Sequence, residues 1–423
     1  MKILMINHFP LTGSGSGTYT RNLAVHLTAL GHEVSIVLPE NMDHFTVPDG
    51  VRIHPVFFTP EDGSHVNTKK PADGRSMETA LPFNFPCFTS HPRSTLSFGD
   101  LNEDQLAMYT DAFRTAIQEE IDTFRPDLIH GQHVWILPAL AADSGIPMIL
   151  TAHGTDLMGY DKWPDLRNYA QAAINACDTV ISISKDNAAL IEARFPENKH
   201  KITLVRNGYD PTIFYPEKLT PEEVLGKYYN IAPEDWKDRR IITFAGKLTY
   251  FKGVDILLEA ARIYEQREPA SLTLIIGDGD ERDNLRFRAR DLKLKTVRFL
   301  GNVEQSELRR LYNIADVSLV PSRREPFGLV AIEAMGCGIP IIASNQGGLP
   351  DFVNNTVGRL VEPGDPADLA DKVTEVLNIT KDGADHWRRD IADYARSHYA
   401  QDAIIREVEK LYKDIIDRRK QTA

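Results

Sequence analysis

The chain has few cysteines and no long apolar run. Its 423 residues include only three cysteines, which lie far apart at Cys87, Cys177 and Cys337. This excludes a disulfide framework and a metal site of closely spaced cysteines, and it is typical of a reducing cytosol. No stretch approaches the roughly 20 apolar residues of a membrane-spanning helix, and the apolar run of MKILMIN is too short for a signal peptide. We therefore expect a cytoplasmic protein without a transmembrane segment.

An excess of positive charge is also absent. The chain carries 60 Asp and Glu against 48 Lys and Arg, which gives a formal net charge of −12. A nucleic-acid-binding protein normally presents a basic surface, so this balance argues against a nucleic-acid partner. With 42% hydrophobic and 26% charged residues the composition is that of a globular protein. A chain of this length suits two domains of roughly 200 residues each.

Short apolar runs alternate with helical patterns along the whole chain. Most of these runs are near-continuous in Val, Ile and Leu, which is typical of parallel strands covered by helices on both faces. The pattern therefore predicts two doubly wound α/β domains. The expected strands are 2–7, 34–38, 52–57, 127–130, 147–151, 179–183, 202–205, 241–245, 272–276, 297–300, 317–320, 340–344 and 357–361.

One interruption of this alternation marks a domain boundary. Gly208 and three prolines break the pattern within 206–223, and a fresh series of strands and helices follows. We expect a first domain over 1–205, a linker over 206–222 and a second domain over 223–399. The last segment, 402–418, has an amphipathic helical pattern.

A glycine-rich run, GSGSG at 13–17, follows the first expected strand and precedes a helix expected at 18–30. A strand ending at Glu40 comes next, so the run imitates a dinucleotide fingerprint. In that fingerprint the first glycine closes the strand directly, whereas five residues separate Asn7 from Gly13 here. An NAD site is therefore disfavoured. A plain flexible loop, and a loop whose amides approach a phosphate or sugar, both remain open.

A carboxylate follows the expected strand at 317–320. The pattern predicts a helix that begins near Pro326, so Glu325 would stand at the helix amino terminus. The amides there are unpaired, so the carboxylate can accept hydrogen bonds from sugar hydroxyls while the amides donate to the sugar oxygens. These amides belong to Phe327, Gly328 and Leu329.

A second carboxylate, Glu333, lies eight residues after Glu325. Its neighbours on the expected helix are apolar all round, which indicates a buried helix, and a buried carboxylate needs hydrogen-bond donors. A ribose diol would supply two. Taken singly, Glu325 could be a helix-capping acid and Glu333 a solvent-facing glutamate, but the apolar surroundings of Glu333 favour a ligand.

Two lysines flank an aromatic turn in GKLTYFKG, directly after the first strand of the second half. Lys247 and Lys252 would lie at the carboxyl end of a parallel strand, where open α/β sheets bind ligands. Two ammonium groups at that edge can hold a diphosphate. Solvated surface lysines are the alternative.

Taken together, these motifs resemble the family 4 retaining glycosyltransferases. The likeness covers nearly the whole chain: the glycine loop with GHEV, then PDLIHGQH, TAHGTD, RNGYDPTIF, GKLTYFKG and the acid pair of EPFGLVAIE. It implies the B-type fold, in which two Rossmann-like domains face each other across a cleft. The first domain would bind the acceptor and be joined by 400–423 crossing back, and the second would bind the donor.

The resemblance implies transfer of a sugar from a nucleotide diphosphate sugar, most simply a UDP- or GDP-sugar, to an acceptor hydroxyl with retention of configuration. Glu325 would bind the donor sugar and Glu333 the ribose, while Lys247 and Lys252 would neutralise the leaving diphosphate. The family usually has arginine where this chain has Lys247, so a point charge replaces a bidentate fork. The other donor-binding positions implied are Gly15, Gly246, Phe327, Gly328 and Leu329.

His153 follows the strand at 147–151. The matching histidine of the family contacts the donor sugar, and this is the role that the resemblance implies for His153. Two alternatives remain: a general base oriented by Asp156 in an inverting enzyme, and a purely structural histidine. His130 and His133 have the positions of strand-end packing residues that could also line the site.

The segment 60–103 has few strand or helix signals, and a loop of this length is commonly functional or disordered. It belongs to the domain that binds acceptors in the family. We hypothesise that its side chains contact a small-molecule or saccharide acceptor. The helix expected at 103–124 is acidic on its polar side, which favours a soluble acceptor over a lipid. It also argues against membrane association. The four residues proposed for the acceptor are Phe83, Phe85, His91 and Arg93.

Asp278 and Asp280 form a D-x-D pattern, which metal-dependent glycosyltransferases of another fold use for manganese. The resemblance places this loop near the nucleobase, and two lysines already supply positive charge, so we expect no metal and no cofactor. A nucleotide-sugar epimerase and an inactive nucleotide-sugar-binding subunit remain as alternatives.

Overall fold

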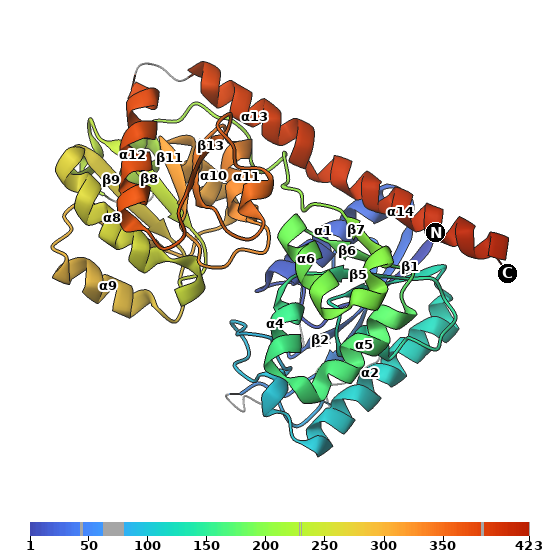
Figure 1. Ribbon diagram of the computed structural model, residues 1–423. Helices are drawn as coiled ribbons and strands as arrows, with labels where there is room; N and C mark the ends of the chain where they lie inside the picture. Colours follow the sequence, from blue (N-terminus) through green and yellow to red (C-terminus); the bar gives the residue numbers. More distant parts are fainter. Residues whose placement is uncertain (43–44, 62–79, 228, 230, 382–384, 423) are drawn as a thin grey trace. The chain divides into compact units, whose positions relative to one another are not determined.

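The computed structural model describes residues 1–42, 45–61, 80–227, 229, 231–381 and 385–422 (Figure 1). They form two compact units. The first unit contains Met1–Ile183, Asn187–Val205 and Ile405–Ala423, and the second contains Ser184–Asp186 and Arg206–Ile404. Each unit is built around one sheet whose paired strands are all parallel.

The first unit has a seven-stranded sheet in the order β3-β2-β1-β4-β5-β6-β7. The order reverses between β1 and β4, and open α/β sheets bind their ligands at such a switch point. Residues 3–6 of β1 are buried because helices cover both faces of the sheet. The strands are β1 (Lys2–Ile6), β2 (Glu33–Glu40), β3 (Val51–Phe57), β4 (Leu128–Gln132), β5 (Met148–Ala152), β6 (Thr179–Ser182) and β7 (Ile202–Leu204).

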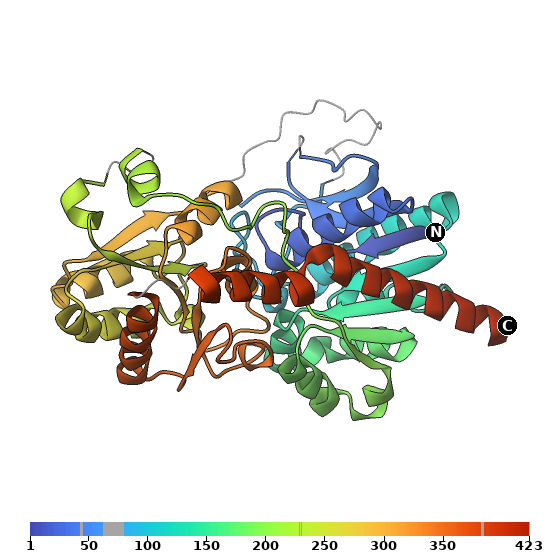
Figure 2. The same cartoon turned by 90° about the horizontal axis from the view of Figure 1, so that it is seen from above.

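Helices cover this sheet and complete its core. The last of them, α14, begins in the second unit and belongs to the first unit from Ile405 onward (Figure 2). The Tyr412 hydroxyl of α14 lies 2.6 Å from the imidazole of His130 on β4. The amphipathic pattern of 402–418 is thereby explained. The helices are α1 (Gly15–Ala29), η2 (Phe98–Asp100), α2 (Glu103–Phe124), α3 (Ile136–Ala139), α4 (Thr155–Lys162), η3 (Pro164–Leu166), α5 (Arg167–Ala176), α6 (Lys185–Arg194), η4 (Pro196–Lys201) and α14 (Gln401–Thr422).

The second unit has a six-stranded sheet in the order β10-β9-β8-β11-β12-β13, which reverses between β8 and β11. Its strands are β8 (Arg240–Ala245), β9 (Ser271–Ile276), β10 (Val297–Gly301), β11 (Val317–Val320), β12 (Ile341–Ser344) and β13 (Gly358–Val361). Its helices are η5 (Glu222–Gly226), α7 (Pro233–Trp236), η6 (Tyr250–Lys252), α8 (Val254–Arg267), α9 (Arg282–Asp291), α10 (Gln305–Asn313), α11 (Leu329–Gly336), η7 (Leu349–Asp351), α12 (Pro366–Lys381) and α13 (Asp385–Tyr399).

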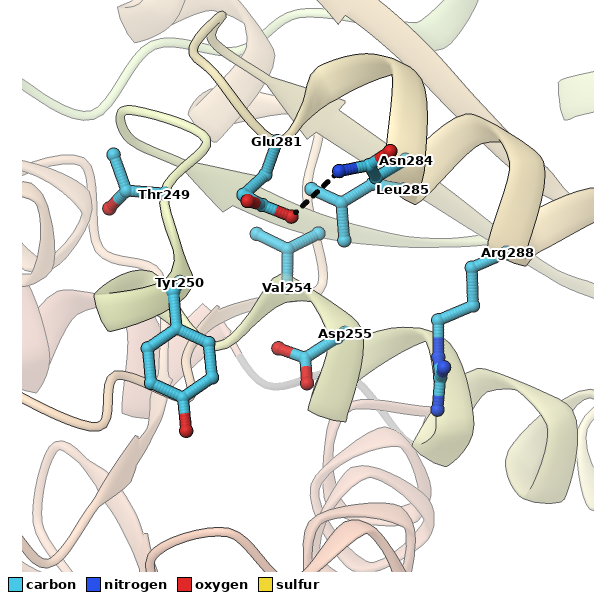
Figure 3. Close-up of a pocket in the computed structure, with 8 residues that line it drawn as sticks. All are labelled: Thr249, Tyr250, Val254, Asp255, Glu281, Asn284, Leu285 and Arg288. Carbon is cyan, nitrogen blue, oxygen red and sulfur yellow. Dashed lines mark hydrogen bonds between the residues drawn. The ribbon is translucent and has the colours of Figure 1, made fainter.

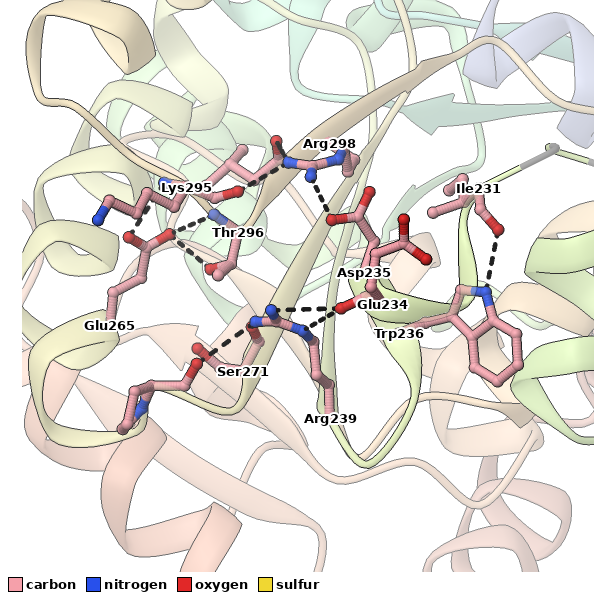
Figure 4. A network of polar contacts seen from close by, with 12 residues as sticks. Ile231, Glu234, Asp235, Trp236, Arg239, Glu265, Ser271, Lys295, Thr296 and Arg298 are labelled. Carbon is pink, nitrogen blue, oxygen red and sulfur yellow. Dashed lines mark hydrogen bonds and ion pairs between the residues drawn. The ribbon is translucent and has the colours of Figure 1, made fainter.

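A polar network ties the chain before β8 to the amino-terminal ends of β9 and β10 (Figure 4). Arg239 donates to the carbonyl oxygens of Ser271 at 3.2 Å and Glu234 at 3.4 Å. Arg298 on β10 lies 2.8 Å from Asp235 of α7. Ligands of open α/β sheets bind at the opposite, carboxyl-terminal edge, so this network stabilises the unit away from any ligand.

The prediction of two doubly wound α/β domains is confirmed. All thirteen expected strands are present, and no strand end differs from its expected position by more than two residues. The expected helix at 18–30 begins earlier, at Gly15, because Ser14 caps it and accepts a hydrogen bond from the amide of Gly17. Within the residues described, no helix combines the length and apolarity needed to span a bilayer.

Candidate active site

In the second unit, Lys252 and Glu325 form an ion pair. Lys252 ends η6 after β8 and Glu325 follows β11, and these strands are neighbours at the switch point. The Lys252 Nζ lies 2.7 Å from Glu325 Oε2, to which the buried Ser322 hydroxyl also donates at 3.2 Å. Glu325 is 6% exposed, so these two partners offset the cost of burying its side chain. The ion pair brings together two residues predicted for the donor site.

The loops after β8 and β11 are held together by their backbones. Gly253 has a φ of 68°, and a Cβ atom there would lie 2.0 Å from the carbonyl oxygen of Pro321. The amide of Arg323 donates to the carbonyl oxygen of Phe251 at 2.8 Å. The Arg323 guanidinium also contacts both carboxylate oxygens of Asp255 at 2.7 Å. Glycine at 253 therefore permits the close approach on which the Lys252–Glu325 contact depends.

The expected start of the helix near Pro326 is wrong. The helix α11 begins at Leu329, because its N-cap Gly328 takes a left-handed conformation with a φ of 109°. Glu325 therefore lies in the preceding loop and not at the helix terminus. Within the described residues, the amides of Phe327, Gly328 and Leu329 still lack a hydrogen-bond acceptor, so they remain donors available to a ligand.

A second loop, which follows β12 and which the sequence analysis missed, contacts the backbone of Glu325. The amide of Gly348 donates to the carbonyl oxygen of Glu325 at 2.9 Å, and a Cβ atom at Gly347 would lie 2.1 Å from that oxygen. The two adjacent glycines of NQGGLPD could have indicated this close approach in the sequence. The Phe327 ring packs against Phe352 at 5.4 Å and is buried, so only its amide could meet a ligand.

Glu333 lies on α11 among buried apolar neighbours such as Ile332 and Met335. Its side chain is partly exposed, and burial raises its carboxyl pKa to about 7. No charged or hydrogen-bonding side chain in the described structure offsets this effect. A carboxyl group in this position can accept two hydrogen bonds from a ligand diol.

Lys247 and Gly246 directly follow β8. Lys247 is exposed, and Gly246 has a φ of 153°. The backbone of the next loop presses against them, since a Cβ atom at Gly277 would lie 2.0 Å from the carbonyl oxygen of Gly246. Both loops therefore meet at the carboxyl edge of the sheet.

The D-x-D pattern has protein partners. Asp278 accepts hydrogen bonds from the amide of Gly279 at 2.7 Å and from the Arg282 guanidinium at 2.9 Å. Over the part of the chain that is described, His, Cys, Asp and Glu form no group of three that could hold a metal ion.

A pocket of about 260 Å³ lies between α9 and the segment from η6 to α8 (Figure 3). The side chains of Lys247, Lys252, Glu325 and Glu333 are not among those that line it. Its lining residues are Thr249, Tyr250, Val254, Asp255, Glu281, Asn284, Leu285 and Arg288.

In the first unit the glycine loop is closely packed. Gly13 has a φ of 86°, and a Cβ atom there would lie 2.6 Å from the imidazole of His91. A Cβ atom at Gly17 would lie 2.1 Å from the carbonyl oxygen of Pro10, whereas one at Gly15 would meet no atom within 4 Å. Glu40 is buried and paired with Arg93. The acid that imitated a ribose-binding residue is thus engaged within the protein, and the NAD interpretation loses its support.

His153 lies just beyond β5 and is held as a neutral imidazole. Its Nε2 lies 2.9 Å from the side-chain oxygen of Gln132, and its ring meets that of Tyr19 edge to face at 5.2 Å. Burial lowers the pKa of His153 to about 3. Asp156 instead accepts hydrogen bonds from the amides of Val134 and Gly154, both at 2.8 Å. Gln132, which the sequence analysis missed, orients this ring, and the predicted alternative of an Asp156-oriented base has no support.

Of the four residues proposed for the acceptor, three are buried in the first unit and Arg93 is partly exposed. The rings of Phe83 and Phe85 belong to its hydrophobic core, where Phe85 is fully buried. His91 is buried, and its Nε2 lies 2.9 Å from the carbonyl oxygen of Thr12. Arg93 pairs with Glu40. These four side chains hold the segment in place, and we propose no direct acceptor contact for them; residues 62–79 lie outside the described residues.

His130 and His133 are both fully buried, as expected of packing residues. The imidazole of His130 is hydrogen-bonded on both sides, to Tyr412 at 2.6 Å and Thr151 at 2.7 Å. His133 has a φ of 80°, and its ring nitrogens have no hydrogen-bond partner within the described chain.

Comparison with known proteins agrees with this geometry. The family model of the glycosyl transferase 4-like domain matches residues 14–208, and that of the glycosyl transferases group 1 matches residues 230–398. A glycogen synthase of Mycobacterium tuberculosis is 28% identical over 398 residues, which cover 89% of this chain and 86% of that protein. An uncharacterized glycosyltransferase of Methanocaldococcus jannaschii is 32% identical over 307 residues, covering 68% and 75%.

Solved structures share the fold. HepE of Anabaena, in complex with UDP and glucose, superposes with a TM-score of 0.71 over 98% of this chain and 99% of that one, at 18% identity. Three findings lead to one conclusion: each unit has a parallel sheet with a switch point, Lys252 pairs with Glu325, and family models match both halves of the chain. The chain belongs to the family 4-type glycosyltransferases of the B-type fold, which transfer a sugar from a nucleotide sugar.

Proposed function

We propose that the protein is a retaining hexosyltransferase that uses a UDP- or GDP-sugar and glycosylates a hydroxyl of a soluble small molecule or saccharide. The observation that carries this proposal is the Lys252–Glu325 ion pair, which lies in the second unit beside amides that have no acceptor among the described residues. A cation, a carboxylate and free donors are the groups needed for a diphosphate and a sugar ring.

Within this site, Lys247 and Lys252 would neutralise the diphosphate as charge develops on it. Glu325 and the amides from Phe327 to Leu329 would bind the sugar hydroxyls. Glu333, whose carboxyl pKa is raised to about 7 by burial, would accept hydrogen bonds from the ribose diol. Because those bonds favour the charged form, donor binding would lower this pKa.

The proposed reaction proceeds on one face of the sugar. The bond between the anomeric carbon and the phosphate oxygen breaks, and the acceptor oxygen forms its bond from the same side through an oxocarbenium-like state. The acceptor proton passes to the departing phosphate oxygen, so the step needs neither a protein nucleophile nor a protein base. His153, with its pKa lowered to about 3, suits hydrogen bonding to a sugar hydroxyl better than proton transfer.

The first unit is proposed to bind the acceptor. The exposed face of α2 carries more acid than base, including Glu103, Asp104, Asp111 and Asp122, so it does not favour anionic lipid surfaces. This supports a soluble acceptor over a lipid.

The test is a thermal-shift panel of nucleoside diphosphates and their sugars, with and without Mg²⁺, followed by assays with candidate acceptors. A cognate ligand should raise the melting temperature in proportion to its affinity and concentration. The product anomer, read by NMR, should keep the donor configuration. An inverted anomer would exclude the retaining reaction, and conversion of the donor without an acceptor would instead identify an epimerase.

A further inference from the structure

A chain of buried hydrogen bonds runs through the first unit from α14 to β5. The Tyr412 hydroxyl lies 2.6 Å from His130 Nδ1, and His130 Nε2 lies 2.7 Å from the Thr151 hydroxyl. All three residues are fully buried. Thr151 lies two residues before His153 on the same strand end, and its hydroxyl also interacts with that of Tyr19.

The direction of these hydrogen bonds follows from burial. His130 is the partner of the Tyr412 hydroxyl in the described structure. If that hydroxyl only accepted a bond, its own proton would be buried without an acceptor, at a cost of roughly 1–3 kcal/mol. Tyr412 therefore donates to Nδ1, and the neutral His130 carries its proton on Nε2 and donates to Thr151.

The series of hydrogen bonds ends near His153, the residue proposed to bind the donor sugar. The hydroxyl proton of Thr151 is left to face Tyr19, whose ring packs edge to face on His153 at 5.2 Å. The His153 ring thus contacts Tyr19 in addition to its hydrogen bond with Gln132.

We infer that Tyr412 is a positioning residue for glycosyl transfer: acting through His130 and Thr151, it places Tyr19 and His153 for the donor sugar. This inference rests on the proposed function, because it takes His153 as the residue that meets the sugar. It assigns a role to the carboxyl-terminal helix beyond packing, since the hydroxyl of one tyrosine on α14 would affect turnover.

The test uses Tyr412→Phe and Thr151→Val in the full chain, both of which remove only the hydroxyl that takes part. The matched control is Tyr109→Phe, since Tyr109 is fully buried in the same unit and its hydroxyl has no hydrogen-bond partner within the described structure. We expect both test variants to lower kcat about tenfold with little change in the donor KM, because a misplaced orienting group slows the reaction more than binding. The control should leave kcat unchanged.

A double-mutant cycle separates positioning from general stabilisation. If Tyr412 acts through Tyr19, then Tyr412→Phe should have little further effect on kcat in a Tyr19→Phe background. Effects on kcat that simply multiply would overturn the inference, as would a Tyr412→Phe variant with unchanged kcat.

Long-range ¹⁵N–¹H NMR of histidine rings provides a readout without activity. The wild type should show His130 as the Nε2–H tautomer, and Tyr412→Phe should shift the ring signals of both His130 and His153. A His153 signal that stays in place while that of His130 moves would overturn the positioning role and leave the proposed function standing. Absence of any transfer in the wild type would instead overturn the proposed function, and the NMR result would still decide whether the coupling exists.

Discussion

The two carboxylates of the proposed donor site, Glu325 and Glu333, differ in their protein partners. Glu325 has two protein partners, whereas the carboxyl of Glu333 has none among the described residues and its pKa is raised to about 7 by burial. The first arrangement keeps a charge in a buried place, and the second leaves a group whose charge depends on pH and on a ligand. Both differences can be measured.

Replacing Lys252 by alanine should impair both activity and stability. The variant loses a cation proposed to meet the diphosphate, so we expect kcat/KM to fall at least 100-fold. It also leaves Glu325 buried without its cation, which should cost about 3 kcal/mol of unfolding free energy, the lower end for a buried pair because the Lys252 side chain is 28% exposed. Lys372→Ala is the control, because Lys372 pairs with Glu375 at 2.9 Å on a helix surface and should contribute at most about 0.5 kcal/mol. Wild-type kcat/KM in Lys252→Ala would contradict the assignment.

Replacing Glu333 by glutamine should stabilise the protein at alkaline pH. A carboxyl whose folded pKa of about 7 exceeds its ordinary value of 4.5 favours folding only while protonated, and that contribution is lost as pH rises through 7. At pH 8 the variant should be more stable by up to about 3 kcal/mol, and at pH 5 the gain should be much smaller. Chemical denaturation at both pH values measures this.

The control for this pH effect is Glu375→Gln. The guanidinium of Arg359 and the ammonium of Lys372 hold the pKa of Glu375 below its ordinary value, so its charge does not change between pH 5 and pH 8. Its effect on stability should therefore be similar at the two pH values. An equal gain for Glu333→Gln at both pH values would refute the raised pKa.

At the scale of elements, the site depends on how closely two loops approach each other. The turn η6 reaches the end of β11 because Gly253 has no Cβ atom, and Gly347 lets a second loop pass behind Glu325. These contacts lie between backbones, which cannot yield as a flexible side chain would. The glycines of this unit are therefore not equivalent.

Gly253→Ala should be among the most destabilising substitutions in the second unit. Its Cβ atom would lie 2.0 Å from the carbonyl oxygen of Pro321, in addition to the strain of a φ of 68°. We expect a loss of at least about 3 kcal/mol. Gly364→Ala is the matched control, since Gly364 has a φ of 82° and open space around it, and it should lose only about 1 kcal/mol. Equal losses, measured by denaturant titration, would show that the close approach does not matter.

At this scale the strands were predictable and the loops were not. Continuous Val, Ile and Leu runs mark buried parallel strands, because both faces of each strand are covered. The start of α11 was misplaced, since the left-handed conformation of Gly328 is set by its neighbours and not by local propensity. The role of Phe83 and Phe85 was misjudged for a similar reason: an aromatic ring in an irregular segment can face a ligand or the core, and only the packing shows which.

At the scale of the whole molecule, the two ends of the parallel strands differ in function. In the second unit the carboxyl edge carries the proposed donor site, and the amino edge carries the network around Arg239 and Arg298 (Figure 4). Ligands of open α/β sheets bind at the carboxyl edge, so changes at the amino edge should affect stability alone.

Arg239→Ala tests this division in the full chain. It removes hydrogen bonds to the carbonyl oxygens of Glu234, Pro269 and Ser271, and we expect a loss of about 1–2 kcal/mol in unfolding free energy. The Kd of the nucleoside diphosphate identified in the thermal-shift panel should not change, as measured by calorimetry. A weakened Kd in a folded Arg239→Ala protein would show that the two edges are coupled.

Local pattern alone was enough for the strands and the fold class, because apolar periodicity expresses interactions between near neighbours in the chain; for the donor site, short motifs supplied candidate residues, whose roles remain predictions. Tertiary structure was needed to pair Lys252 with Glu325, Arg93 with Glu40 and His130 with Tyr412, residues that lie dozens to hundreds of positions apart. The physical reason is that strand order decides which loops meet, and the loops that meet decide which buried charge or hydroxyl finds a partner.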